Sequence, residues 1–164
     1  MREAVGGSMS LMVIALFLLI VNCYLAFSVN YTKAFRVKNE ILSIIEKYEG
    51  LTVDARSRIQ TYMNQTNYRV NEGFLQWCTA NGYQVERNDF GSFCYKCEKV
   101  DQTGNAHPNS KYKGTYYSVA TFVNIDIPMI NNLLPVTGNI FRVEGETEII
   151  YSSGNNSEVC PNTT

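Results

Sequence analysis

Charged side chains are scarce in this sequence. Of its 164 residues only 18% are Asp, Glu, Lys or Arg, where soluble domains usually have about 25%, and the formal net charge is -1. A hydrophobic content of 45% excludes a chain that is disordered throughout. The near-zero net charge excludes a sequence-wide attraction for nucleic acid, so we expect no nucleic-acid partner. The length leaves room for one domain and a small appendage.

Motifs that carry chemistry are missing as well. The single histidine, His107, precedes Pro108 in a segment rich in Gly, Asn and Ser. The sequence contains no phosphate-binding glycine loop, zinc-protease motif or nucleophile elbow. A lone loop histidine without an orienting partner is usually just solvated. We therefore expect no enzyme activity, no catalytic residue, no metal site and no cofactor.

Glycine and proline are absent between Ser8 and Glu49, and polar residues are rare in the first half of that stretch. At about 1.5 Å rise per residue, a helix over residues 9–29 spans roughly 31 Å, the thickness of a hydrocarbon core. We expect a short N-terminal tail at 1–8 and a transmembrane helix at 9–29, with the lipid bilayer as a partner. The alternative is a cleaved signal peptide, which the length of the apolar run and the offset of Arg2 by Glu3 disfavour.

An apolar stripe continues beyond this run. Five residues recur at spacings of three and four: Ala34, Val37, Ile41, Ile44 and Tyr48. The pattern predicts one continuous helix of about 40 residues that ends at Gly50, with an amphipathic extension at 30–50. We expect the stripe to dock a globular head and, with the rest of residues 10–48, to associate with helices of neighbouring subunits. A break near Asn30 is the alternative.

The remaining sequence predicts an α+β head over residues 51–151, followed by a polar C-terminal tail at 152–164. Thr52 is a suitable N-cap for a short second helix that ends by about Asn67. Four strands are expected, at 84–87, 92–100, 117–127 and 140–151. Consecutive strands usually pair, so these should form an antiparallel sheet whose odd-numbered face packs on the helices. The predicted fold class is α+β, with a long N-terminal helix, a short second helix and an antiparallel sheet.

The five cysteines divide into one within the apolar run and four in the head. Cys23 is expected to be a small apolar helix residue. The even set Cys78, Cys94, Cys97 and Cys160 predicts two disulfides with three possible connectivities. Cys94 and Cys97 point to opposite faces of a strand, and reflection about the first hairpin turn places Cys78 nearest Cys97, which leaves Cys94 for Cys160. Free thiols, a metal site of all four cysteines and redox activity stay open as alternatives.

The orientation in the membrane has two interpretations. Lys33, Arg36 and Lys38 outnumber Arg2, and the positive-inside rule alone would keep the head in the cytoplasm. However, these basic residues also serve the solvated face of an amphipathic helix, and four head cysteines suit an oxidising compartment. We therefore expect a single-pass protein of the cell membrane with an extracytoplasmic head.

The order of these segments resembles the TadE-like pseudopilins of bacterial tight-adherence pilus systems. The likeness covers residues 8–50 and 117–150: a strand to Ile127, an apolar Pro128–Pro135 turn, and a second strand with Arg142-Val143-Glu144 where the family has Arg-Val-Glu. It implies a bacterial structural or assembly component of a pilus or related secretion apparatus, with apparatus subunits or further copies of itself as partners.

The sequence departs from the pilin pattern at the processing site. Gly7 precedes an apolar run with no glutamate at the fifth position after it, which favours a minor or uncleaved component over a major pilin. The alternative function is a secreted or membrane-tethered extracellular binding module unrelated to pili. Neighbouring genes for a secretion ATPase and polytopic platform proteins would distinguish the pilus component from this alternative.

Overall fold

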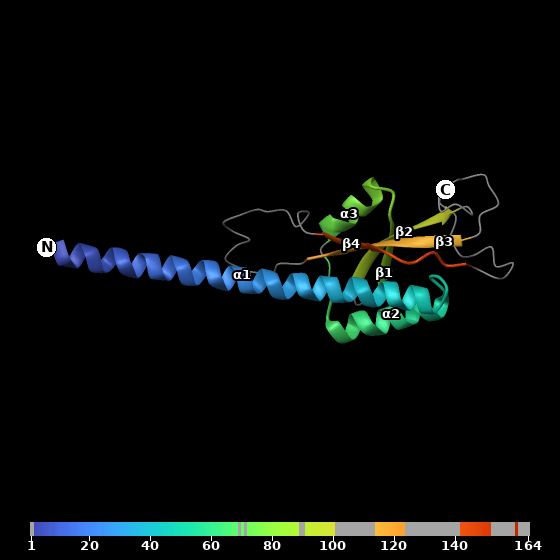
Figure 1. Cartoon of the computed structure of the whole chain (residues 1–164), viewed down its shortest axis with the longest axis horizontal. Helices are drawn as coiled ribbons and strands as arrows, with labels where there is room; N and C mark the ends of the chain where they lie inside the picture. The colour runs from blue at the N-terminus through green and yellow to red at the C-terminus, as the bar shows by residue number, and fades with distance from the viewer. Residues whose placement is uncertain are drawn as a thin grey trace.

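One helix dominates the architecture (Figure 1). The computed structural model describes residues 2–68, 70, 72–88, 91–100, 114–123, 142–151 and 160. Within it, α1 (Arg2–Lys47) runs unbroken for 46 residues, so the predicted continuous helix is confirmed and the break near Asn30 is wrong. Asn30 instead donates to the Ala26 carbonyl oxygen of the preceding turn, at 3.0 Å.

The helix α1 ends at Lys47, close to Gly50, where the sequence predicted its end. Glu49 adopts a left-handed conformation with φ of 54°, and Gly50 follows with φ of 141°. The Gly50 N–H donates to the Ile45 carbonyl oxygen at 2.9 Å, which satisfies one of the last helix carbonyls. The chain then turns back into α2 (Val53–Thr66), whose N-cap is Thr52, as predicted.

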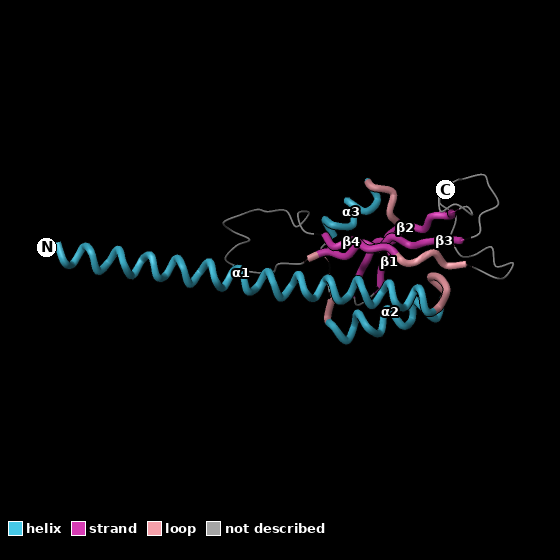
Figure 2. The backbone as a smooth tube through the Cα atoms, viewed as in Figure 1, coloured by secondary structure: helices cyan, strands magenta, loops and turns pink. Residues whose placement is uncertain are grey.

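Four strands form one antiparallel sheet in the order of the chain: β1 (Gln84–Asn88), β2 (Gly91–Val100), β3 (Gly114–Phe122) and β4 (Arg142–Glu146). The α+β class is therefore confirmed. Figure 2 shows α1 and α2 on one side of the strands and a third helix, α3 (Glu72–Ala80), on the other. The expected loop at 101–113 with His107, the apolar turn at 128–135 and the tail apart from Cys160 lie outside the described residues.

The main core lies between the sheet and the second half of α1. Tyr117, Val119 and Val123 of the β3 segment are buried there, which confirms the predicted odd-numbered face. The opposite face of β3 is also covered, since Ala120 and Phe122 pack with α3 in a second cluster. The sequence predicted no helix at α3, and its inward residues are Phe74, Leu75 and Cys78.

The predicted alternation along the last strand is correct only at its start. Val143 and Thr147 are buried as expected, but Ile150 is buried while Ile149 and Tyr151 are exposed. The register explains this: Ser118 pairs with Glu146, whereas the isolated bridge joins Thr115 to Ile150, so one extra residue intervenes on the last strand. A shift of one residue exchanges the two faces of a strand.

Candidate functional site

The first half of α1 presents an apolar surface that does not pack on the head. Apart from the half-buried Phe27, the large apolar side chains from Met9 to Val29 are exposed, from 36% for Val21 to 76% for Met12. This helix is long and apolar enough to cross a membrane, and its most apolar stretch is wholly unburied. In Figure 1 the same half projects past the end of the sheet. An exposed apolar surface of this extent marks contact with lipid or with other apolar surfaces.

Polar side chains within this surface and just beyond it bond to their own helix. The Asn22 side-chain amide donates to the Leu18 carbonyl oxygen at 2.7 Å. The Thr32 hydroxyl donates to the Ser28 carbonyl oxygen at 2.8 Å. Such bonds to the residue four positions back reduce the cost of a polar group in lipid. Cys23 is half-buried and forms no disulfide. The apolar half of α1 is thus compatible with a hydrocarbon environment despite its polar interruptions.

The predicted stripe docks α1 on its own head. Ala34, Val37, Ile41 and Ile44 are buried in the main core, and Tyr48 packs against it. The expected association of this stripe with neighbouring subunits stays a prediction, and in the single chain the stripe is covered by its own head. Within the described residues, the exposed apolar surface of α1 that is free for association includes most of the run from Met9 to Val29, and Tyr31 and Phe35 extend it.

Close contact between α1 and β4 depends on Gly145. A Cβ atom at this position would lie 2.8 Å from Lys38 Cδ and 2.9 Å from Leu42 Cδ1. The helix is also tied to the sheet by the Thr121 hydroxyl, which donates to the Ala34 carbonyl oxygen at 3.0 Å. The head therefore holds the second half of α1 by direct backbone approach as well as by apolar packing.

Two disulfides link the four head cysteines, but not in the predicted pairs. Cys78 joins Cys94 with a Cα–Cα distance of 6.1 Å, and Cys97 joins Cys160 at 5.6 Å. The predicted opposite orientation of Cys94 and Cys97 is confirmed, since Cys94 packs with α3 and Cys97 against the main core. The proposed register was wrong because Cys78 belongs to a helix that crosses the sheet face, not to an arm of the hairpin.

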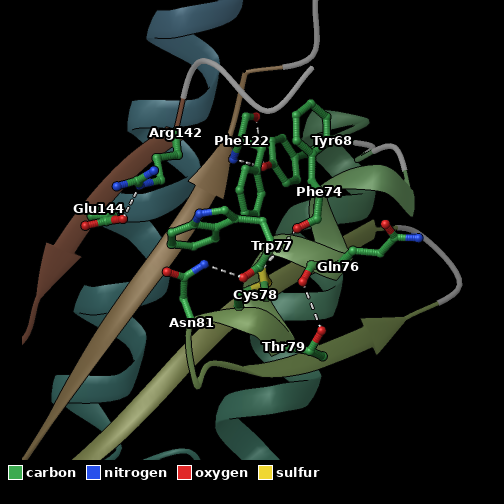
Figure 3. The surroundings of a disulfide bond; sticks show 11 residues. Tyr68, Phe74, Gln76, Trp77, Cys78, Thr79, Asn81, Phe122, Arg142 and Glu144 are labelled. Atoms are coloured by element: carbon green, nitrogen blue, oxygen red, sulfur yellow. Dashed lines mark hydrogen bonds and ion pairs between the residues drawn. A yellow bond between two sulfur atoms is a disulfide. The ribbon is translucent and has the colours of Figure 1, made fainter. Parts of the chain in front are cut away.

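Aromatic side chains surround the Cys78–Cys94 bond (Figure 3). Phe74 stacks on Phe122 with ring centroids 5.0 Å apart, and Trp77 meets the edge of Phe122 at 6.0 Å. The Arg142 guanidinium lies 4.4 Å from the Trp77 ring centroid. These contacts close the α3 side of the sheet over the disulfide.

The aromatic residues near the first hairpin lie on both faces of the sheet. Phe74 and Trp77 lie on the α3 side, whereas Phe93 and Tyr95 are in the main core on the other face. Phe90 lies outside the described residues. Alternation along β2 separates the two pairs, because Phe93 and Tyr95 share the face opposite Cys94.

The Arg-Val-Glu segment that supports the family resemblance has a structural role in this fold. Val143 is buried against α1, while Arg142 and Glu144 are exposed and form an ion pair with each other. Such an exposed pair contributes little to stability. The pair instead orients the guanidinium of Arg142, the first residue of β4, over the Trp77 ring.

Within the ranges that the structure describes, no group of three or more His, Cys, Asp and Glu side chains could hold a metal ion. No protein-family model matches the sequence, and neither a curated protein nor a solved structure is significantly similar to it. The features that bear on function are therefore those of the chain itself: an exposed apolar helix half joined without a break to a disulfide-linked head.

Proposed function

We propose that this protein is a membrane-anchored, pseudopilin-like structural or assembly component of a tight-adherence pilus or a related secretion apparatus. The observation that carries the proposal is the division of α1: its first half is exposed and apolar, and its second half is buried along one side in the head core. A continuous helix with these two halves couples a membrane segment rigidly to a folded head. That coupling is what a subunit needs if it is held in a bilayer and presented to an assembly outside it.

The proposed mechanism is lateral association of the helix half at residues 9–29. Lipid tails and apolar side chains are equivalent surroundings for leucine, so transfer from lipid to a neighbouring helix costs little hydrophobic free energy. Polar groups then add specificity. Asn22 uses one N–H on Leu18 and retains its side-chain oxygen and second N–H for a neighbouring helix.

The proposed location is a single-pass membrane protein with the head on the extracytoplasmic side. Two disulfides in the described head support this side, because thiols are kept reduced in the cytosol. A test is a membrane-impermeant thiol reagent applied to intact cells that produce a variant without its own cysteines and with Lys47→Cys, since Lys47 is exposed at the distal end of α1. Labelling before lysis is expected, and labelling only after lysis would place the head inside.

Site-specific photo-crosslinking in the producing cells tests the assembly role. A photoreactive amino acid replaces Leu16 or Leu19 in the exposed half of α1, and Arg58 on α2 serves as the control position. Cross-links from Leu16 and Leu19 to other pilus or secretion subunits, identified by mass spectrometry, are expected. If cross-links form only to lipid, and deletion of the protein leaves surface filaments and secretion unchanged, the protein is a tethered binding module and the proposal fails.

A further inference from the structure

A groove lies between α1 and α2 at the junction of the exposed helix half and the head. Its volume is about 620 Å³, and its walls include Val29, Thr32, Lys33, Arg36, Tyr62 and Thr66. At about 1.5 Å rise per residue, Lys33 lies about 6 Å and Arg36 about 10 Å along the helix beyond Val29. Val29 is the last residue of the predicted membrane segment at 9–29, so the groove begins where that segment ends.

The groove places two cations and several hydroxyl groups above an apolar base. Lys33 Nζ donates to the carbonyl oxygen of Asn67 at 2.8 Å, which fixes the ammonium at the C-terminal end of α2 and leaves two of its three N–H groups free to donate elsewhere. Arg36 is exposed and forms no ion pair with any described residue. Within the described part of the chain, the groove therefore has positive charge that no carboxylate neutralises by direct contact.

A carboxylate farther along α1, that of Glu40, acts on the Tyr62 hydroxyl of the groove. Burial raises the pKa of the Tyr62 hydroxyl, Glu40 raises it further, and Arg36 opposes that shift. Glu40 lies one helical turn beyond Arg36, on the side away from the apolar run. Tyr62 is consequently a neutral hydroxyl donor at physiological pH, and the charge of the groove mouth toward the apolar run is positive.

We propose that this groove binds the phosphate headgroup of an anionic phospholipid in the leaflet from which the head emerges. This rests on the proposed function, in which residues 9–29 span the bilayer. The headgroup layer adds about 5–8 Å to each side of the hydrocarbon core, which is the height of Lys33 above Val29. Arg36 reaches the same layer from one turn above, because its long side chain can extend toward the phosphates.

The position of Val29 favours a lipid over a soluble phosphate as the ligand of the groove. Val29 is exposed at the base of the groove, where the acyl chains of a bound lipid would begin, and a soluble anion gains nothing from that contact. Guanidinium and ammonium groups together suit a phosphodiester, since the first binds two oxygens and the second acts as a point charge. A lipid held in this way would fix the height of the head above the membrane.

The test uses the full chain reconstituted in vesicles of equal parts phosphatidylglycerol and phosphatidylcholine. Native mass spectrometry of the extracted protein then counts the lipids that stay bound. The wild type is expected to retain phosphatidylglycerol in preference to phosphatidylcholine. The Lys33→Gln/Arg36→Gln variant should reduce this preference by about fivefold for each charge removed, because one basic side chain near an anionic surface contributes about 1 kcal/mol.

A matched control is Lys47→Gln/Arg58→Gln, which removes the same charge from exposed positions away from the groove. It should keep the wild-type preference. Arg36→Gln alone leaves the Lys33–Asn67 hydrogen bond intact and should still lose about fivefold, so the test does not depend on a variant with a disturbed α2 end. An equal loss in the control, or no preference in the wild type, would overturn the inference.

Two further measurements, flotation with the vesicles and competition by inorganic phosphate, distinguish a failure of this inference from a failure of the proposed function. If the wild-type chain does not float with the vesicles in a density gradient, the membrane anchor itself is wrong. If it floats but binds both lipids equally, only the headgroup site is wrong. An excess of inorganic phosphate should leave the bound phosphatidylglycerol in place, and its displacement would assign the groove to a soluble anion instead.

Discussion

The hydroxyl group of Tyr68 serves both backbone polar groups of Phe122. It accepts from the Phe122 N–H at 2.7 Å and donates to the Phe122 carbonyl oxygen at 3.0 Å. Tyr68 directly follows α2 and its cap, and Phe122 is the last residue of β3, so one phenol joins the second helix to the end of the central strand. Burial raises the pKa of this hydroxyl, which stays protonated and able to donate.

Replacement of this phenol by a phenyl ring should be costly. Tyr68→Phe leaves a buried N–H and a buried carbonyl oxygen of Phe122 without their partner, and we expect a loss of about 3 kcal/mol in the free energy of unfolding. Denaturant titration of the full chain in detergent micelles measures this, with the fluorescence of Trp77, the single tryptophan, as the probe. Tyr151→Phe, at an exposed tyrosine, should cost little. Equal losses in the two variants would mean that the paired hydrogen bonds do not stabilise the head.

The disulfide between Cys97 and Cys160 closes a long loop. The two cysteines are 63 residues apart, and closing a loop of that length stabilises a fold by about 4 kcal/mol through the entropy of the unfolded chain. Cys97→Ser/Cys160→Ser should therefore lower the free energy of unfolding by about that amount. Thermal or denaturant unfolding of the wild type and the double variant measures the difference.

Peptide mapping of the unreduced protein checks the connectivity independently. Denatured protein from an oxidising compartment should show one free thiol per chain, that of Cys23. Digestion should give one linked pair that contains Cys78 and Cys94 and another that contains Cys97 and Cys160. A linked pair of Cys78 with Cys97 would contradict the placement of α3 on the face of β2.

Glu98 and Tyr116 face each other across the β2–β3 ladder and share a hydrogen bond. This bond raises the pKa of Tyr116 to about 12, and burial adds to the shift. Hydrogen bonds from Lys96 and then Tyr116 lower the pKa of Glu98. Because the pKa of Tyr116 is raised, its protonated form stabilises the fold below about pH 10, and this stabilisation is lost as the pH rises to about 12. Because the pKa of Glu98 is lowered, its charged form stabilises the fold above the ordinary carboxyl range, and this stabilisation is lost in acid.

Removal of the Glu98 charge should release Tyr116. In Glu98→Gln we expect the pKa of Tyr116 to fall toward 10.0, its ordinary value, in an NMR titration of carbon-13-labelled tyrosine rings. Glu146→Gln is the matched control, because Glu146 raises the same pKa by charge alone and by less than Glu98 does. A larger fall in the control would show that the hydrogen bond to Glu98 is not the main cause.

Local signals were sufficient for the helices whose pattern is periodic or capped. The buried stripe of α1 follows from the helical period alone, since Val37, Ile41 and Ile44 must share a face whatever they pack against. The start of α2 follows from Thr52, whose hydroxyl accepts from the Ala55 N–H at 3.2 Å. Neither inference needs knowledge of the tertiary structure.

Features that depend on tertiary neighbours were not predictable. The helix α3 is nine residues long, too short for its apolar spacing to stand out, and its position decides which cysteine meets Cys78. The shift of faces after Glu146 depends on a bridge to Thr115 that no local pattern encodes. The basic groove needs the end of α2 to lie beside Lys33, a contact between residues 34 positions apart.

A charge in the middle of the exposed helix half should prevent membrane insertion without unfolding the head. Leu18 and Leu19 lie near the centre of residues 9–29, are more than half exposed, and belong to neither core cluster. A lysine at the centre of a membrane helix costs about 3 kcal/mol, so Leu18→Lys/Leu19→Lys should cost about 6 kcal/mol of insertion free energy. The variant should move from the vesicle fraction to the soluble fraction in a flotation gradient, while Leu18→Ala/Leu19→Ala stays with the vesicles. Near-ultraviolet circular dichroism should be the same for both, because the head core begins at Ala34; a doubly charged variant that still floats would exclude residues 9–29 as the membrane anchor.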